Sequence, residues 1–234
     1  MKSVILCFFG LVSLTNCLDL IVSLDKSWCE KTPNCLYAGE NASNIIQNGL
    51  NMIRIEKGGS ILIKEGVYIL STQLTLYGNT TFVGEGIDKT VFKLQDFASS
   101  WRLSGILRST WKSGNCSNLV FKSFTLDGNK QNQVVNASIS DYGRFGLFTE
   151  MCHNVVVDSV RITSFQGYGF DPHGNKGDRF AYNLIIKNCI ADTNDWDGFT
   201  LDQTIGIDVQ NCTSYNNCLL YTSDAADDTP CVDL

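Results

Sequence analysis

Four segments of the chain resemble one another, and this repetition constrains the fold more than any other feature of the sequence. The segments begin at Asn118, Asn154, Asn183 and Gly206 and read NLVFKSFTLDGN, NVVVDSVRITSF, NLIIKNCIADTN and GIDVQNCTSYNN. Their starts are 36, 29 and 23 residues apart, so insertions lengthen the first two steps. A short period with strand-like runs separated by turns is typical of a solenoid, in which each coil buries its apolar face against its neighbours.

The alternation of apolar and polar residues within each segment predicts an all-β fold, a parallel β-helix. Asn occupies the twelfth position in three of the segments, as Asn129, Asn194 and Asn217, which predicts a ladder of side-chain amides between coils. Cys189 and Cys212 share a position in adjacent repeats. We favour two stacked small core residues there, and a disulfide is the alternative that the inter-strand spacing allows. A leucine-rich repeat is disfavoured because its L-x-x-L-x-L-x-x-N pattern does not recur.

The segment before the repeats is predicted to close one end of the solenoid. Asn41 has the character of a helix N-cap, and apolar residues follow it at helical spacing, namely Ile45, Ile46, Gly49, Leu50 and Ile53. Such a helix would cover the apolar end of the first coil, which is otherwise exposed. Cys29 and Cys35 are predicted to form a disulfide in an oxidising compartment.

The two ends of the chain are predicted to lie outside the β-helix domain, which we place at residues 18–217. Residues 1–17 read MKSVILCFFGLVSLTNC, typical of a secretory signal peptide. Residues 218–234 read CLLYTSDAADDTPCVDL, which resembles the translation of a transposase adapter used in sequencing libraries and is not expected to be native. The domain is then incomplete at its C-terminal end. Sequons at Asn41, Asn79, Asn115, Asn136 and Asn211 suit a secreted glycoprotein.

Composition excludes several classes of function. Apolar residues make up 44% of the chain, which excludes intrinsic disorder. The formal net charge of -6 disfavours a broad basic surface for nucleic acid. No internal apolar run is long enough to predict a membrane span. Phosphate-binding glycine loops, zinc-ligand spacings and serine-nucleophile elbows do not occur in the sequence.

One corner of the solenoid carries the residues best suited to chemistry. The string YGFDPH places Tyr168, Asp171 and His173 together, and Asp202 follows 31 residues after Asp171, about one coil later. Stacking would bring these four side chains side by side. A phenol, an imidazole and two carboxyls suit removal of the C-5 proton of a uronate, which needs a neutralised substrate carboxylate, a base and an acid. A polar turn broken by Pro172 is the alternative interpretation, and His153 is predicted to be structural or on the surface.

These strings, together with Asp197-Gly-Phe and Leu126-Asp-Gly-Asn129, resemble the catalytic module of the mannuronan C-5 epimerases and related alginate lyases. The resemblance implies a right-handed parallel β-helix, an acidic polysaccharide such as alginate or a pectin-like polymer as substrate, and calcium as a cofactor. It implies that Tyr168 and His173 form the acid/base pair, and that Asp171 and Asp202 handle the substrate carboxylate and orient the pair. The candidate substrate-binding residues are Asp141, Arg144, Trp196 and Lys130.

The sequence departs from the family pattern at two positions. Ile139 stands where the family has a Lys, so Lys130 or Arg144 would have to supply the cation. Gly174 stands where an acidic residue often follows the His.

Three alternatives to an epimerase stay open at this point. An alginate lyase shares the first proton abstraction. A pectin-type glycoside hydrolase would use carboxylate pairs drawn from Asp195, Asp197 and Asp202. It is disfavoured because the Asn-Thr-Asp, Gly-His-Gly and Arg-Ile-Lys strings of polygalacturonases are absent. A non-catalytic carbohydrate-binding solenoid is favoured by Ile139 and disfavoured by the retained acid/base set.

Overall fold

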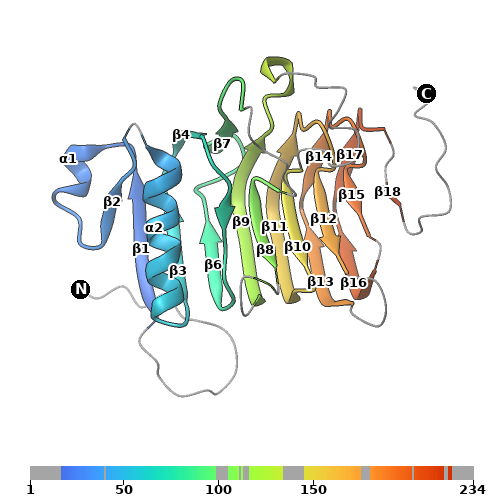
Figure 1. Ribbon diagram of the computed structural model, residues 1–234, viewed down its shortest axis with the longest axis horizontal. Helices are drawn as coiled ribbons and strands as arrows, with labels where there is room; N and C mark the ends of the chain where they lie inside the picture. The colour runs from blue at the N-terminus through green and yellow to red at the C-terminus, as the bar shows by residue number, and fades with distance from the viewer. Residues whose placement is uncertain are drawn as a thin grey trace.

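The chain winds into a parallel β-helix whose coils stack along one axis, from β2 and β1 at one end to β16 and β17 at the other (Figure 1). The computed structural model describes residues 17–39, 41–98, 105–110, 112, 116–133, 145–174, 180–201, 203–218 and 221–222. The helical elements are α1 (Lys26–Cys29), α2 (Ala42–Ile55) and a short 3-10 helix, η2 (Lys130–Asn132). The first nine strands are β1 (Leu18–Ser23), β2 (Cys35–Tyr37), β3 (Gly59–Ile63), β4 (Gly66–Leu70), β5 (Leu74–Thr75), β6 (Thr80–Val83), β7 (Thr90–Leu94), β8 (Leu107–Thr110) and β9 (Ser117–Asp127). The remaining strands are β10 (Leu147–Glu150), β11 (His153–Thr163), β12 (Phe170–His173), β13 (Ala181–Lys187), β14 (Ile190–Asp192), β15 (Phe199–Thr200), β16 (Thr204–Gln210), β17 (Thr213–Tyr215) and β18 (Tyr221–Thr222).

Two parallel sheets form the walls of the solenoid. The larger sheet has the order β16-β13-β11-β9-β6-β3-β1-β2, with β4, β7, β14 and β17 paired beside this path. The smaller sheet has the order β18-β15-β12-β10-β8-β5. Each coil therefore contributes strands to both sheets, and a given position in one coil lies directly above the same position in the next.

The register of the larger sheet repeats the steps seen in the sequence. Leu119 pairs with Val155, Val155 with Leu184, and Leu184 with Ile207, which are steps of 36, 29 and 23 residues. The sequence prediction of a parallel β-helix is thus confirmed, and the insertions lie outside the paired strands.

Columns of apolar side chains fill the interior. Leu119, Val155 and Leu184 form one such column and are almost fully buried, and aromatic rings such as Phe82 and Phe124 pack edge to face nearer the N-terminal end. In the last described coil the same inward column reaches Ile207, which is only partly buried, and Val209 beside it is 36% exposed. The core is continuous because each coil covers the apolar face of the one before it.

Asparagine side chains connect successive coils at one corner. Asn79, Asn118, Asn154 and Asn183 all have a left-handed backbone, with φ between 56° and 60°. Their amides form a ladder: Asn118 donates to Asn79 at 2.9 Å, Asn154 to Asn118 at 2.9 Å, and Asn183 to Asn154 at 3.0 Å. Asn tolerates this backbone better than other residues with a side chain, and its amide both donates and accepts. The corner therefore selects Asn for two physical reasons at once.

The ladder predicted at the twelfth position forms only in part. Asn194 Nδ2 donates to Asn217 Oδ1 at 2.9 Å. Asn129 instead donates to the Leu94 carbonyl at 3.0 Å and to Asp96 at 2.7 Å. It has no amide partner one coil later because Phe165 occupies that position. The shared feature of these Asn residues is a hydrogen bond to a backbone carbonyl of the preceding coil, as Asn194 makes to Ile162 and Asn217 makes to Ala191.

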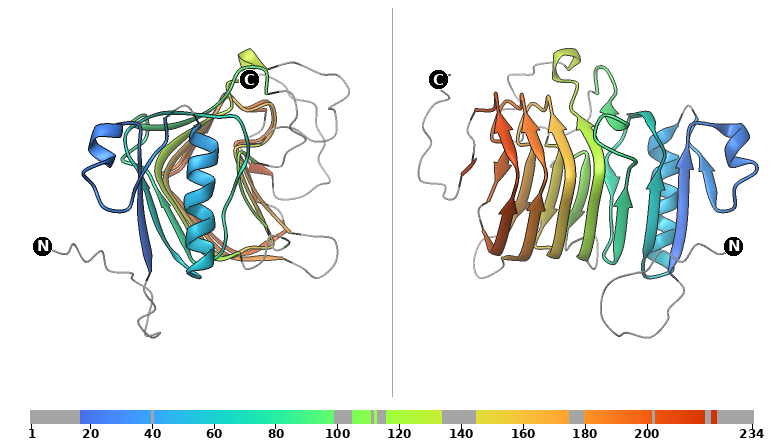
Figure 2. Two further views of the ribbon diagram at one scale, coloured as in Figure 1. Left: turned by 60° about the vertical axis from the view of Figure 1, so that its left-hand side comes forward. Right: turned by 180° about the vertical axis from the view of Figure 1, so that it is seen from behind.

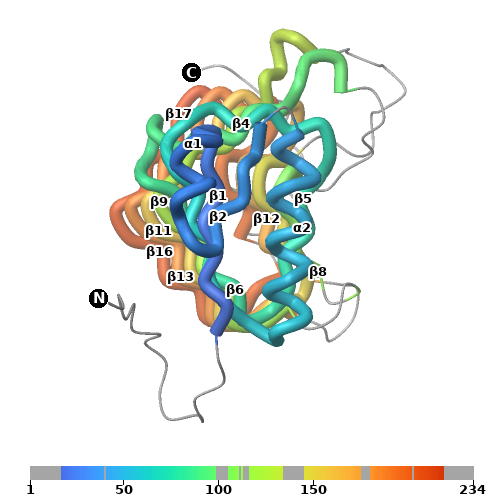
Figure 3. The backbone as a smooth tube through the Cα atoms, turned by 90° about the vertical axis from the view of Figure 1, so that its left-hand side faces the viewer, coloured from blue at the N-terminus to red at the C-terminus, as the bar shows by residue number. Residues whose placement is uncertain are grey.

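The helix predicted before the first coil is confirmed as α2, which lies at the N-terminal end of the solenoid (Figures 2 and 3). Asn41 is its N-cap and accepts from the Asn44 backbone amide. Its buried face consists of Ala42, Ser43, Ile46, Gly49, Leu50 and Ile53. The face packs against the first strands and covers the apolar end of the core.

The disulfide predicted between Cys29 and Cys35 is present and joins α1 to β2. Cys189 and Cys212 are free thiols in adjacent coils, with Cys189 buried. The stacked arrangement is therefore the one observed. Burial raises the pKa of Cys189 to about 12.

The predictions for the two ends stay predictions. Residues 1–16 lie outside the described part of the chain, as do residues 219–220 and 223–234. Within the C-terminal segment, β18 pairs in parallel with β15. Among the described residues, neither α-helix is long and apolar enough to cross a lipid bilayer.

The asparagine ladder yields a prediction about stability. Replacing Asn154 by Ala removes two inter-coil hydrogen bonds and puts a β-carbon on a left-handed backbone, and we expect it to lower the free energy of unfolding by about 2 kcal/mol. Asn154→Gly loses the same bonds but keeps the backbone unstrained, and we expect a loss of about 1 kcal/mol. Urea unfolding followed by circular dichroism measures both. Wild-type stability in the alanine variant would contradict this account of the ladder.

Candidate functional site

Two of the predicted catalytic residues, Asp171 and His173, lie on β12 of the smaller sheet, which pairs in register with β10 of the preceding coil. Leu147 pairs with Phe170, Phe148 with Asp171, and Glu150 with His173. Leu147 and Phe170 belong to the core, and side chains alternate between the two faces of a strand. Phe148, Glu150, Asp171 and His173 therefore project from the outer face, in two neighbouring coils.

Glycines lie where the backbones of these coils approach each other most closely. Gly146 donates its N–H to the Tyr168 carbonyl at 3.0 Å, and Gly169 donates to the Asp197 carbonyl at 2.9 Å. A β-carbon at Gly169 would lie 2.5 Å from the carbonyl oxygen of Gly198, so only glycine fits there. The Gly in YGF and in DGF is thus a requirement of stacking.

Tyr168 lies in an aromatic cluster next to these glycines. Its ring centroid is 5.0 Å from that of Phe145 in the preceding coil and 4.9 Å from that of Trp196 in the following coil. Phe145 is also 6.2 Å from Phe148. The cluster fixes the phenol ring from both sides, so its hydroxyl is presented in a defined direction.

Asp171 and His173 form the most distinctive pair in the structure. The His173 Nδ1 lies 3.8 Å from Asp171 Oδ1, and the imidazole stacks on Phe148 with a centroid distance of 6.0 Å. The His173 side chain is 40% exposed, whereas that of Asp171 is 5% exposed. Asp171 Oδ1 is buried and has no hydrogen-bond partner. Burying such a group without a partner costs free energy, so this oxygen is held ready for a donor that arrives from outside.

The other predicted site residues divide into two groups. Trp196 packs on Tyr168, and Lys130 Nζ bonds Asp195 Oδ1 at 2.8 Å. Asp141, Arg144, Asp202 and Ile139 lie outside the described residues. The roles assigned to all these residues stay predictions.

Two residues that the sequence analysis did not single out belong to this face. Arg108 pairs in register with Phe148, and its guanidinium carbon lies 5.5 Å from the Phe148 ring centroid. Phe148 in turn separates Arg108 from Asp171 and His173. The signal that identifies them is the recurrence of short strands, LRST, LFTE and FDPH, each after a connection of different length. The step from Arg108 to Phe148 is 40 residues, which hides this repeat from a search for constant spacing.

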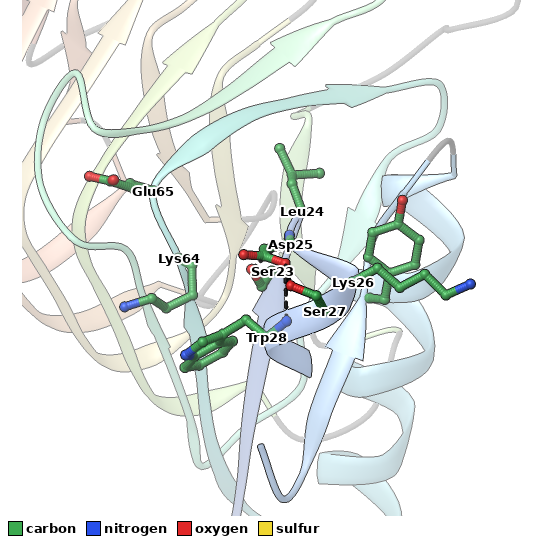
Figure 4. Close-up of a pocket in the computed structure, with 9 residues that line it drawn as sticks. Ser23, Leu24, Asp25, Lys26, Ser27, Trp28, Lys64 and Glu65 are labelled. Carbon is green, nitrogen blue, oxygen red and sulfur yellow. Dashed lines mark hydrogen bonds between the residues drawn. The ribbon is translucent and has the colours of Figure 1, made fainter. Parts of the chain in front are cut away.

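A hollow of about 740 Å³ lies elsewhere, beside α1 at the N-terminal end (Figure 4). Trp28 and Lys64 line it, with the Lys64 ammonium 5.5 Å from the Trp28 ring centroid. Asp25 caps α1 there, and hydrogen bonds from Ser27 and the Trp28 backbone lower its pKa. No predicted catalytic residue lines this hollow, so we place the candidate site at the outer face of β10 and β12 instead.

The described residues do not offer a metal site. Among them, no group of three or more His, Cys, Asp or Glu side chains is arranged to hold a metal ion. Calcium is therefore assigned to none of the described residues.

A second buried carboxylate provides a reference for Asp171. Asp192 lies on the larger sheet, where Arg161 bonds both of its oxygens at 2.8 and 3.1 Å and Thr163 donates at 2.8 Å. Burial opposes ionisation of Asp192, but these hydrogen bonds outweigh it and lower its pKa. The two aspartates are thus almost equally buried, and only Asp192 has a full set of partners.

Comparisons with known proteins agree with this geometry. The protein-family model "Right handed beta helix region" matches residues 110–229. Mannuronan C5-epimerase AlgE6 of Azotobacter vinelandii is 32% identical over 74% of this chain and 20% of its own length. Alginate lyase 7 of the same organism is 31% identical over 75% of this chain and 20% of its own length.

A solved structure gives the same picture. The A-module of Azotobacter vinelandii AlgE6 superposes with a TM-score of 0.65 at 30% identity, covering 75% of this chain and 46% of that module. This chain therefore spans about a fifth of the length of these two curated relatives and about half of the solved module.

The contrast between the two buried aspartates yields a prediction. Asp171→Asn removes a buried charge that lacks partners, and we expect the free energy of unfolding to stay the same or rise by up to about 1 kcal/mol. Asp192→Asn deprives Arg161 of its main partner, and we expect a loss of about 2 kcal/mol. Urea unfolding near pH 7 measures both. Equal losses in the two variants would show that Asp171 is a structural residue.

Proposed function

The chain belongs to the right-handed β-helix family and is homologous to mannuronan C5-epimerases and an alginate lyase, and from this we propose that it removes the C-5 proton of uronate residues in an acidic polysaccharide. Epimerisation of mannuronan is the activity that we favour. The observation that carries the proposal is the pairing of an exposed imidazole with a buried carboxylate whose oxygen lacks a partner. This pair projects from the outer face of the solenoid, where an extended polymer has access.

The chemistry begins with the charge on the sugar. The C-5 hydrogen lies beside a carboxylate, and its removal builds further negative charge on that group in the transition state. A cation or a hydrogen-bond donor must neutralise the carboxylate first. Asp171 contributes such a donor in the state of the site in which its carboxyl carries the proton and His173 is neutral. When His173 is charged, Asp171 is a carboxylate, and its unpartnered Oδ1 accepts from the imidazolium instead.

Proton transfer is assigned to Tyr168 and His173. One of the pair takes the C-5 proton, and the bonding electrons move into the substrate carboxylate. The other then returns a proton to the opposite face of C-5, which inverts the centre. The rings of Phe145 and Trp196 hold Tyr168, and the ring of Phe148 supports His173, so both groups have restricted positions.

Arg108 is the cation that we assign to the substrate carboxylate. It lies on the same outer face, one strand beyond Phe148, and has no carboxylate partner within the described residues. Lys130 is engaged with Asp195, which leaves it less suited to this role. A guanidinium can bond both oxygens of a carboxylate at once. Arg108 would then replace the Lys that is absent at position 139.

Lyase activity is the second candidate, supported by the homology to alginate lyase 7. The first step is identical: the same base removes the C-5 proton. The acid then protonates the glycosidic oxygen at C-4 instead of C-5, and that C–O bond breaks by β-elimination to leave an unsaturated end.

Secretion through residues 1–17 completes the proposal and places the protein where such polymers occur.

A single assay distinguishes the candidates. The protein is incubated with polymannuronate in deuterated water, with calcium and with a chelator, and followed by proton NMR. We expect guluronate that carries deuterium at C-5, because the returned proton comes from groups that exchange with solvent. Unsaturated ends would indicate a lyase. Binding of polymannuronate without either product would contradict the enzymatic proposal and support a carbohydrate-binding solenoid.

The two histidines of the chain form a matched pair of variants. We expect His173→Ala to reduce turnover by at least 100-fold, the usual range for loss of a general acid or base. His153→Ala changes an exposed ring that contacts Tyr182 on the larger sheet, and turnover should be close to wild type. Full activity of the His173 variant would refute the assignment.

Arg108 gives a separate prediction about binding. Arg108→Ala should lower kcat/KM by about 100-fold, which corresponds to the loss of a charge-assisted hydrogen bond of about 2.7 kcal/mol. Arg108→Lys keeps the charge but not the two-pronged geometry and should recover part of the loss. Steady-state kinetics on polymannuronate measures both. Equal activity in all three proteins would mean that another cation neutralises the substrate.

A further inference from the structure

Glu150 is a second carboxylate beside His173, and it comes from the preceding coil. The two residues are register partners in adjacent parallel strands, β10 and β12. Partners of this kind project from the same face, with β-carbons about 5 Å apart. Side-chain flexibility allows a Glu carboxylate to reach the imidazole from that position.

The environment of Glu150 shows that its carboxylate lacks a partner. Its Oε2 is buried and makes no hydrogen bond. The backbone at this position is fixed, because the Sγ atoms of Cys116 and Cys152 lie 3.7 and 3.6 Å from the Glu150 carbonyl. A buried carboxylate oxygen without a donor is uncommon and points to a group that pairs with it in another state of the site.

The described neighbours of His173 come from its own strand and from β10, β8 and β15. Asp171 approaches the ring along its own strand, with Oδ1 3.8 Å from Nδ1. Two residues of β10 are neighbours of the ring. Phe148 stacks on the face of the imidazole, and Glu150 is the register partner of His173. Arg108 on β8 lies beyond Phe148, and Thr200 on β15 is uncharged. Among the residues that the structure describes, two carboxylates and one more distant cation therefore surround the imidazole, and the predicted neighbour Asp202 lies outside them.

We propose that Glu150 is a positioning residue for His173, whose carboxylate holds the imidazolium form of the ring together with Asp171. In this proposal, the protonated ring of His173 donates one N–H to Asp171 and the other to Glu150. Both carboxylate oxygens that are buried without partners then acquire a donor. The pair of carboxylates favours the charged ring and so sets the pH at which His173 changes between base and acid.

This role also bears on position 174. The family pattern that the sequence resembles has an acidic residue directly after the His, where this chain has Gly174. Glu150 supplies a carboxylate to the same imidazole from the neighbouring coil. Its catalytic consequence rests on the proposed function, but its effect on the His173 proton does not.

Proton NMR of the imidazole C2 hydrogens tests the inference without any substrate. The chain has only His153 and His173, so two resonances titrate, and the His153→Gln variant assigns them. We expect the His173 midpoint to fall by about 0.5–1 pH unit in Glu150→Gln, because the neutral amide no longer favours the imidazolium. Glu150→Asp keeps the charge on a shorter side chain and should give an intermediate midpoint. The His153 midpoint should not move in either variant and serves as the internal control.

The outcomes separate this inference from the proposed function. An unchanged His173 midpoint in folded Glu150→Gln would overturn it, and so would an equal shift of both histidines. If the glutamine variant does not fold, Glu150→Ala decides, because it also removes the charge and an unchanged midpoint there would overturn the inference as well. If polymannuronate is turned over, the pH profile of kcat should move in the same direction as the His173 midpoint, with KM nearly constant. Absence of turnover would refute the proposed function and leave the NMR result intact.

Discussion

In-register hydrogen bonding between parallel coils is the constraint on which the rest of this structure depends. Each coil pairs with the next through the same backbone positions. Residues at equivalent positions of the sequence repeat therefore lie directly above one another. The core grows as columns of like side chains, and the outer face grows as columns of side chains that share a solvent-exposed surface. The candidate site is one consequence of this rule, because Phe148, Asp171, Glu150 and His173 meet only through the pairing of β10 with β12.

The corners of the coils satisfy the same constraint through a left-handed backbone conformation that is uncommon for residues other than glycine. Left-handed backbone recurs at intervals of five residues, as at Asn154, Ser159 and Ser164. Asn at such a corner satisfies both its own backbone conformation and the polar groups of the adjacent coil. Glycine serves where two backbones approach too closely for a β-carbon, as Gly169 does against Gly198. Asn and Gly at these positions are therefore required by the turns and the close packing of the coils. For this reason the strings DGN and DGF indicate the fold and are weak evidence of function.

Sequence reasoning predicted the fold well and the site incompletely, for a physical reason. The strands of the larger sheet keep their repeat across insertions, so the steps to Asn154, Asn183 and Gly206 were visible in the sequence and are confirmed in the register. The strands of the smaller sheet are only two to four residues long and follow long insertions. Their register cannot be read from spacing, so Arg108 and Glu150 escaped notice. The ladder at the twelfth position was predicted because three repeats have Asn there. Each Asn also needs an Asn at the same position of the next coil, and Asn129 lacks one because Phe165 lies there.

Buried carboxylates in this fold differ in how many hydrogen-bond donors surround them, and we use this difference to separate structural from candidate functional positions. Asp192 is buried with Arg161 and Thr163 around it, as expected of a group that stabilises the solenoid. Asp171 and Glu150 each keep a buried oxygen without a donor, on one face and one coil apart. A folded chain tolerates such a deficit only where other interactions compensate, and a site that must bind a proton or a substrate donor requires it. In the function that we propose, the deficit on both sides of His173 serves a proton that arrives and leaves, rather than the stability of the coil.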